Sequence, residues 1–287
     1  MIKRPILKQW IAKTVYTFFA CVLISCGPPS TTIIANPAGY DLKHPVTTKL
    51  PFVLNEISGL TYYSHDKSLF AIQDEEGYLY KIYTDRKDSM LRWKFAGHGD
   101  FEDLVLLDST FYILRSDGDI FATTIKDSVT STKYDFPDKG NEIESMYYDP
   151  ALRQMILVCK SCQDDKRKKL STYAFDPTTR QYVTDTMQFD TKEIARLEGE
   201  EKIKFKPSAA AINPLNGKIY LVSSVNKLLV IANRDGTIAE AYDLDPGLFK
   251  QPEGIAFAPD GTMYISNESA DIGAATILTF PYHLNKK

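Results

Sequence analysis

Two stretches of the sequence share one pattern, QPEGIAFAPDGTMYISNES at residues 251–269 and KPSAAAINPLNGKIYLVSS at residues 206–224. Each places a Glu or Ser before a short apolar segment, follows it with a turn containing Asp-Gly or Asn-Gly, and continues into a second apolar segment. Such dipeptides between apolar segments are strong signals of a β-hairpin. A hairpin that recurs along a chain predicts a repeat architecture of antiparallel strands.

The same start occurs three more times, at residues 56–60, 100–104 and 142–146. Aligned on the Ser or Glu, the five copies fall at Ser58, Glu102, Glu144, Ser208 and Glu253. The intervals are 44, 42, 64 and 45 residues, and a four-stranded propeller blade needs about 40–50 residues. The long interval is too short for two blades, and its extra segment, residues 192–201, has helical periodicity. The spacing therefore predicts an all-β propeller of five four-stranded blades.

Closure of the ring requires one more strand, because only three strands follow Glu253. We expect the segment between Ile33 and Leu54 to supply the fourth strand of the last blade, which removes exposed strand edges. The content of 17 Tyr and 15 Phe suits strands. A sixth blade in the N-terminal segment and a sandwich of two sheets are the alternatives.

The N-terminus predicts export. Four basic side chains precede the apolar run 15–25, which is too short to span a bilayer comfortably. The tetrapeptide LISC that ends at Cys26 resembles a bacterial lipobox, which implies cleavage before Cys26 and a lipid on its sulfur. We therefore expect a signal peptide (1–25), a lipidated tether (26–36) and one propeller domain (37–287). A secretory signal with a chance cysteine and an uncleaved anchor are the alternatives.

The net charge and the expected lipid anchor together limit the kinds of binding partner that we expect. Residues 1–25 carry no acidic side chain, so removing them takes the net charge from −3 to about −7. An acidic domain favours cations and disfavours polyanions, so we expect no nucleic-acid partner. The lipid would hold a monomer at a membrane of the bacterial cell envelope, on the periplasmic side or at the cell surface.

The aligned positions predict a metal site. The innermost strands of a propeller run along the central channel, so the five aligned side chains should form a ring at one mouth. Carboxylates this close repel one another, and oxygen donors without His or Cys favour Ca²⁺ over Zn²⁺. The predicted ligands are Ser58, Glu102, Glu144, Ser208 and Glu253, with Glu56, Asp100 and Glu142 behind them. Alternatively, these glutamates cap turns or pair with Lys and Arg.

The ends of the second strands should line the same mouth, because neighbouring strands are antiparallel. The side chains there are Asp74, Glu75, Arg115, Lys160, Ser224, Asn267 and Glu268. A metal flanked by Arg115 and Lys160 suits an anionic ligand such as a phosphate ester, and salt bridging between blades is the alternative. Cys159 and Cys162 end a strand instead of opening a helix, which favours a local disulfide over a redox site.

The repeated segments resemble the SdiA-regulated family of bacterial propeller proteins. The resemblance rests on the two stretches quoted first and on NEISGLTYY (55–63), GDFEDL (99–104) and NEIESMYYDP (141–150), and it covers roughly residues 50–283. It implies an exported, calcium-binding propeller. Members are often grouped with six-bladed phytase-like propellers, whereas the spacing here indicates five blades.

The order Ser, Glu, Glu, Ser, Glu also resembles calcium-activated nucleotidases (apyrases), which are five-bladed propellers with a central Ca²⁺, although the apyrase substrate motifs are missing. Two functions follow. The first is a calcium-binding lipoprotein that presents a surface for a small anionic ligand or a protein partner. The second is a Ca²⁺-dependent phosphoester or ester hydrolase in which Glu268, Asp74 or Glu75 acts as the base.

Overall fold

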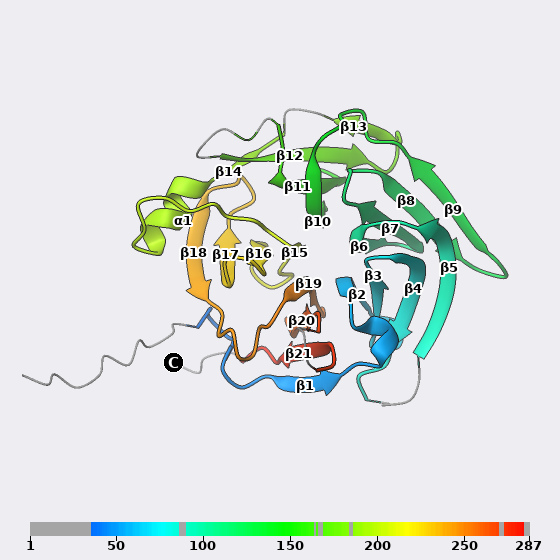
Figure 1. The fold of residues 1–287 in the computed structure, drawn as a ribbon, viewed down its shortest axis with the longest axis horizontal. Helices are drawn as coiled ribbons and strands as arrows, with labels where there is room; N and C mark the ends of the chain where they lie inside the picture. Colours follow the sequence, from blue (N-terminus) through cyan, green and yellow to red (C-terminus); the bar gives the residue numbers. More distant parts are fainter. Residues whose placement is uncertain are drawn as a thin grey trace, which may run out of the picture. The chain divides into compact units, whose positions relative to one another are not determined.

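The computed structural model describes residues 36–85, 90–163, 165, 169–183, 186–269 and 273–283. These residues form five antiparallel sheets arranged in a ring, which confirms the predicted five-bladed β-propeller (Figure 1). The expected signal peptide, the lipidated Cys26 and nearly all of the tether lie outside the described residues. No helix in the described part of the chain is long and apolar enough to cross a membrane.

Four blades follow the chain outward from the axis. The first contains β2 (Ile57–Tyr63), β3 (Ser68–Gln73), β4 (Glu76–Ile82) and β5 (Met90–His98). The second contains β6 (Phe101–Leu107), β7 (Thr110–Arg115), β8 (Ile120–Ile125) and β9 (Val129–Tyr134). The third contains β10 (Glu142–Asp149), β11 (Gln154–Ser161), β12 (Lys169–Asp176) and β13 (Gln181–Val183). The fourth contains β15 (Ala209–Ile212), β16 (Ile219–Ser223), β17 (Leu228–Ala232) and β18 (Ile238–Asp243).

The closing blade joins the two ends of the domain. Its strands are β19 (Pro252–Phe257), β20 (Met263–Asn267), β21 (Thr276–Phe280) and, outermost, β1 (Val46–Lys49). β1 pairs with β21 in antiparallel register, with Val46 opposite Thr279. The N-terminal segment thus supplies the missing strand, as expected. A short 3₁₀ helix, η1 (Phe52–Leu54), leads from it into the first blade.

The long third repeat departs from the regular blade. The outermost strand of this blade is two short pieces, β13 and β14 (Gln188–Asp190), and both pair with β12. The helix expected at 192–201 is α1 (Thr191–Leu197), whose first turn is capped by the Asp190 side chain accepting from the Lys192 N–H at 2.9 Å. The helix ends early because Gly199 adopts φ +72°, which stops helical continuation.

Aromatic side chains hold neighbouring blades together. Phe70 of the first blade packs on Phe111 of the second, with ring centroids 4.6 Å apart. Tyr112 of the second blade packs against Phe175 of the third, with ring centroids 6.2 Å apart. Inner strands contact one another around the whole ring, β2 with β6, then β10, β15, β19 and back to β2. The high Tyr and Phe content therefore serves packing between blades, and it fixes the inner strands around the axis.

Candidate functional site at the propeller axis

Most inner strands carry a β-bulge at the position that the sequence repeats. In β6 the ladder skips Glu102, since its two neighbours pair with consecutive residues of β7. Corresponding register shifts occur in β2, β10 and β19, at Ser58, Glu144 and Glu253. A bulge bends its strand and re-aims a side chain, and bulges are common beside functional sites. The aligned Ser and Glu residues are thus turned out of the regular ladder at one end of the channel, which we call the mouth.

Three of the aligned side chains form an acidic ring, defined here as Glu102, Glu144 and Glu253. Burial raises the pKa of Glu102 to about 10, and the carboxylates of Glu144, Asp100 and Glu253 add to the rise. Burial likewise raises the pKa of Glu253 to about 7, again with a contribution from Glu144. The three carboxylates therefore lie close enough to interact electrostatically, as the aligned register predicts.

Lys160, at the end of β11, brings one positive charge into this ring. Its ammonium donates a hydrogen bond to the Glu144 carboxylate and lies 3.4 Å from a carboxylate oxygen of Glu142. Burial still raises the pKa of Glu144, although Lys160 opposes the rise. Full ionisation of the three ring carboxyls, with Lys160 paired to Glu144, would therefore leave negative charge at the mouth, and the raised pKa values of Glu102 and Glu253 oppose it.

The two serines of the predicted ligand set are engaged in backbone contacts. The Ser208 hydroxyl lies just before β15, donates to the Pro252 carbonyl at 2.6 Å and accepts from the Ser224 N–H at 3.2 Å. Ser224 in turn hydrogen-bonds the Glu253 side chain. The Ser58 carbonyl accepts from the Ser266 hydroxyl at 3.1 Å. These bonds tie the segment before β15 to β19, and β2 to β20.

The donor set fits a hard cation in its chemistry. Carboxylates and hydroxyls are the ligands that Ca²⁺ prefers, and a cation would offset the charge of the ring carboxylates once they ionise. In the side-chain arrangement observed, no group of three His, Cys, Asp or Glu among the described residues is gathered closely enough to hold a metal. The Lys160 ammonium instead neutralises Glu144. A metal would therefore have to draw the carboxylates inward and replace this ammonium.

A second acidic group, Glu56, Asp74 and Glu268, lies where the first blade meets the closing blade. Burial raises the pKa of Asp74 to about 6, and Glu56 adds to it. Burial raises the pKa of Glu268 to about 7, with further contributions from Asp74 and Glu56. Gln73 donates to Glu56 at 3.2 Å and Gln251 donates to Glu268 at 3.0 Å. This group contains two carboxyls that change protonation near neutral pH.

The other predicted mouth residues have varied surroundings. The Asp100 carboxylate contributes to the raised pKa of both Glu102 and Glu144, so it stands behind the ring. Glu75 is exposed. Asn267 is buried in β20 and donates to the Leu248 carbonyl at 3.1 Å, while its amide oxygen lacks a hydrogen-bond partner within the described residues.

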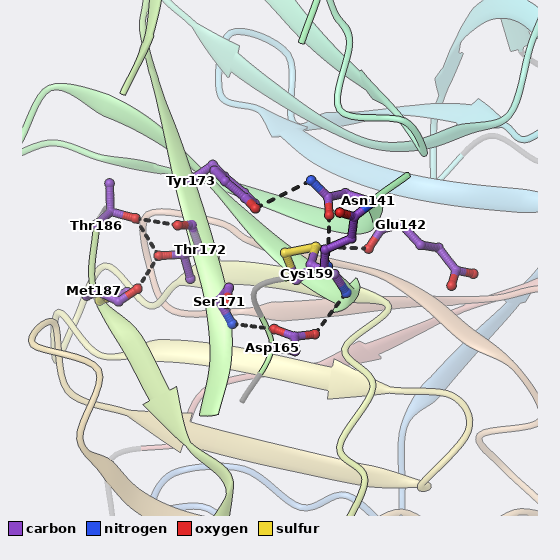
Figure 2. Close-up of a disulfide and its surroundings, with 11 residues drawn as sticks. Asn141, Glu142, Cys159, Asp165, Ser171, Thr172, Tyr173, Thr186 and Met187 are labelled. Atoms are coloured by element: carbon purple, nitrogen blue, oxygen red, sulfur yellow. Dashed lines mark hydrogen bonds between the residues drawn. A yellow bond between two sulfur atoms is a disulfide. The ribbon is translucent and has the colours of Figure 1, made fainter. Parts of the chain in front are cut away.

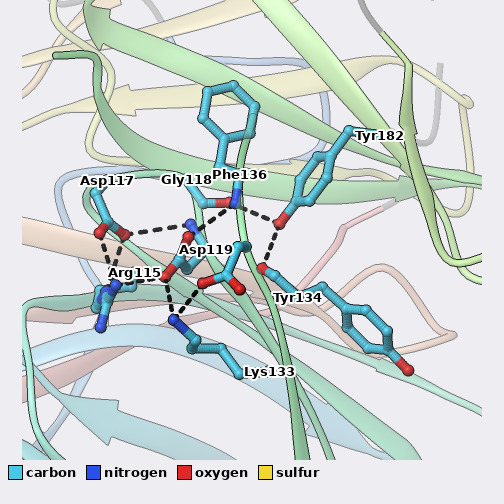
Figure 3. Close-up of polar contacts among 9 residues, drawn as sticks. Arg115, Asp117, Gly118, Asp119, Lys133, Tyr134, Phe136 and Tyr182 are labelled. Carbon is cyan, nitrogen blue, oxygen red and sulfur yellow. Dashed lines mark hydrogen bonds and ion pairs between the residues drawn. The ribbon is translucent and has the colours of Figure 1, made fainter. Parts of the chain in front are cut away.

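Arg115 is paired with carboxylates of the turn that follows it. Its guanidinium donates to both oxygens of Asp117, at 2.9 and 2.7 Å, and also pairs with Asp119 (Figure 3). Lys133 of β9 joins the same network, 3.1 Å from Asp119. Arg115 and Lys160 share no ion-pair partner among the described residues. In the structure each of these two cations is thus paired with carboxylates of its own surroundings, and the anion clamp stays a prediction.

The cysteine pair forms a disulfide between Cys159 and Cys162 (Figure 2), as the C-x-x-C spacing predicts. The Cys162 N–H donates to Asp165 at 2.9 Å, and the other oxygen of Asp165 accepts from the Ser171 N–H at 2.8 Å. The disulfide loop encloses Lys160. It therefore restrains the strand end that directs the ammonium towards Glu144.

Asp103 is an axial residue that the sequence pattern did not single out. Its side chain is 2% exposed and accepts backbone N–H groups of Leu104 and Met146, both at 2.8 Å, and of Ala210. It thereby joins β6, β10 and β15, and burial raises its pKa in spite of these bonds. The other repeats place a small residue at this point, namely Gly59, Ser145, Ala209 and Gly254. An acidic residue at a position where the other repeats have a small one was therefore the sequence signal that could have identified Asp103.

Comparisons with known proteins place the chain in a family and show its fold. A family model described as SdiA-regulated matches residues 37–271. No curated protein matches the chain significantly. Similar solved structures include a Myxococcus xanthus glutaminyl cyclase, at 14% identity over 84% of this chain and 97% of that chain, with a TM-score of 0.55. A luciferin-regenerating enzyme is 12% identical over 84% of this chain and 96% of that chain, with a TM-score of 0.52. A calcium-binding protein, regucalcin, from Agrobacterium tumefaciens is 13% identical over 86% of this chain and 98% of that chain, with a TM-score of 0.50. These identities show the shared fold alone.

Proposed function

The chain belongs to the SdiA-regulated family, and from that premise we propose that it is an exported, membrane-anchored propeller that binds Ca²⁺ at the mouth of its channel. The bound ion would form the base of a surface that receives a small anionic ligand or a protein partner. The observation that carries the proposal is the acidic ring itself, three carboxyl groups that gather at the mouth with pKa values raised by burial, of which Glu144 is paired with the ammonium of Lys160.

In the metal-free protein a proton relieves the repulsion among the ring carboxylates, and a divalent cation would compete with that proton. With a pKa of about 10, Glu102 holds a proton at neutral pH when no metal is present. Metal ligands bind in their deprotonated form, so a cation that binds the ring must displace this proton. Ca²⁺ binding at neutral pH should therefore release protons, which a simple electrostatic attraction to exposed carboxylates would not do.

Three neighbours of the ring define what binding requires. Glu144 can turn to a metal only if Lys160 leaves it, and Ser58 and Ser208 would supply hydroxyl oxygens beside Glu102 and Glu253. When bound, Ca²⁺ supplies a positive charge at the mouth that attracts an anionic group. Lys160, once displaced, offers a second positive charge to the same group.

Membrane anchoring is the second part of the proposal, and it rests on the LISC sequence before the tether. Cys26→Ala should release the protein from the membrane fraction of expressing cells, since a lipid on that sulfur is the proposed attachment. Metabolic labelling with a fatty acid provides the positive control. Unchanged membrane association of the variant would refute the anchor.

The calcium proposal is tested by titration calorimetry on the purified protein. Binding should be abolished or weakened at least tenfold in Glu102→Gln and in Glu253→Gln, and retained in Glu201→Gln, an exposed glutamate that serves as the matched control. Repeating the titration in buffers of different ionisation enthalpy measures the proton release. Equal affinity in all four proteins, or binding without proton release, would contradict the ring as the site.

A second candidate function has one specific observation in its favour. Asp74 and Glu268 have pKa values of about 6 and 7, which suit general acid–base work near neutral pH. Beside a Ca²⁺-polarised phosphoester or ester, either could activate water. Turnover of p-nitrophenyl phosphate and simple lactones, with and without EGTA, tests this function. Calcium-dependent turnover that Asp74→Asn and Glu268→Gln remove would establish it, and absence of turnover on every substrate would leave the binding role.

A further inference from the structure

The largest of the cavities described beside the mouth lies next to the disulfide and has a volume of about 400 Å³. Its wall is formed by the end of β11, the start of β12 and the segment 203–206 that leads to Ser208. Lys160, Lys169, Lys204 and Lys206 line it. We call this space the lysine cavity.

The charge of the lysine cavity is unbalanced in the opposite sense to that of the acidic ring. Among the described residues, Asp165 is the one carboxylate in its lining, and both of its oxygens already accept backbone N–H groups. The ammonium groups of Lys169, Lys204 and Lys206 make no ion pair with any described residue, whereas Lys160 is engaged by Glu142 and Glu144. Three lysines without an ion-pair partner among the described residues therefore line one cavity in an acidic protein.

The rest of the lining is apolar. Leu170 and Phe205 are each 3% exposed, and Ile203 lies beside them. Leu170 and Phe205 are packed into the core, so Ile203, which is half-buried, is the apolar side chain most open to a ligand. A ligand with an anionic group and an apolar part would cover this side chain and neutralise the ammonium groups.

We propose that the lysine cavity binds a small organic anion, a molecule with one carboxylate, phosphate or sulfonate group on an apolar body. The volume suits a single molecule of this kind. The proposal rests on the proposed function in one respect, that the mouth receives a ligand, and it names the class of that ligand. The three free lysines are not members of the acidic ring, so the cavity requires no bound Ca²⁺.

The test uses 8-anilinonaphthalene-1-sulfonate as the probe, with the full chain in EDTA and fluorescence as the readout. The variant Lys169→Gln/Lys204→Gln/Lys206→Gln should bind the probe at least tenfold more weakly than the unmodified protein. The matched control Lys43→Gln/Lys126→Gln/Lys250→Gln removes three exposed lysines elsewhere and should bind it unchanged. Thermal unfolding of all three proteins checks that the fold is retained.

Two further arms define the ligand. The uncharged analogue N-phenyl-1-naphthylamine should bind with equal affinity to both variants, since its binding would use the apolar surface alone. Phenyl phosphate should displace the sulfonate probe, whereas displacement by phosphatidylglycerol vesicles but not by phenyl phosphate would overturn a soluble ligand in favour of a lipid surface.

Equal binding of the sulfonate probe by the unmodified protein and the cavity variant would overturn the proposal, as would an equal loss in the control variant. Calcium titration of the cavity variant separates the two proposals. Retained Ca²⁺ binding with lost probe binding supports the cavity as an independent site. Probe binding retained in the cavity variant refutes the cavity even where the ring binds Ca²⁺ as proposed.

Discussion

Replacing Glu102 with Gln should stabilise the metal-free protein and remove its response to calcium. The ordinary pKa of a glutamate is 4.5, and in the folded protein that of Glu102 is about 10 because of burial and the neighbouring carboxylates. Between pH 4.5 and 10 the unfolded chain has therefore lost this proton, while the folded chain still holds it. Stability due to Glu102 is complete below pH 4.5 and is lost progressively as the pH rises towards 10.

The magnitude follows from the width of that window. At pH 7 the solution is about 2.5 pH units above the ordinary pKa at which the unfolded chain loses the proton. Each unit lowers the free energy of unfolding by about 1.4 kcal/mol, which gives an upper estimate of about 3 kcal/mol for the loss. Gln cannot ionise and has nearly the same shape, so Glu102→Gln should match the unmodified protein near pH 4 and exceed its stability by up to about 3 kcal/mol at pH 7. Saturating Ca²⁺ should stabilise only the unmodified protein and reverse the order.

Urea unfolding at pH 4.5, 6 and 7.5, each with EDTA and with Ca²⁺, measures this difference. Glu201→Gln, at an exposed position, is the control and should follow the unmodified protein at every pH. A Glu102→Gln variant that is less stable than the unmodified protein at pH 7.5 in EDTA would refute the reasoning. Parallel pH dependence of the two proteins would refute it equally.

Three further changes test other parts of the structure. Asp103→Ala should lower the free energy of unfolding by about 3 kcal/mol or more, because three buried N–H groups lose their acceptor; a loss below 1 kcal/mol in urea unfolding would show that Asp103 does not join the inner strands. Replacing both Cys159 and Cys162 with Ala should cost at most about 2 kcal/mol, because the closed loop is short, and a thermal melt that shows global unfolding at 37 °C would contradict this. Lys160→Met should raise the Ca²⁺ affinity about tenfold by removing the competing ammonium, equivalent to about 1.4 kcal/mol; weaker binding in calorimetry would show that Lys160 assists the metal instead.

The number of blades and the way the ring closes could be predicted because both follow from spacing. The Ser or Glu that recurs in each repeat marks the start of every inner strand, and the three-strand deficit after Glu253 required a strand from the N-terminal side, which β1 supplies. What the pattern did not reveal is that this residue sits in a bulge. A bulge depends on how two strands pair, which the order of residues along one strand does not encode.

The candidate site was predictable where it depends on register and not where it depends on competing partners. The ring glutamates converge because equivalent strand positions meet at the axis. Arg115 pairs instead with Asp117 and Asp119, which lie two and four residues away along the chain. Those carboxylates were visible in the sequence RSDGD, so their local pairing was open to prediction. The reach of Asp103 to β10 and β15 was not, since it requires the packed ring.

The measurement closest to the central claim is a crystal structure grown with Ca²⁺, in which anomalous scattering identifies the ion. The account predicts one ion at the mouth, bound by oxygens of Glu102, Glu144 and Glu253, with Lys160 displaced from Glu144. An anomalous map without a peak there, with the Lys160 ammonium still paired to Glu144 at saturating Ca²⁺, would contradict it.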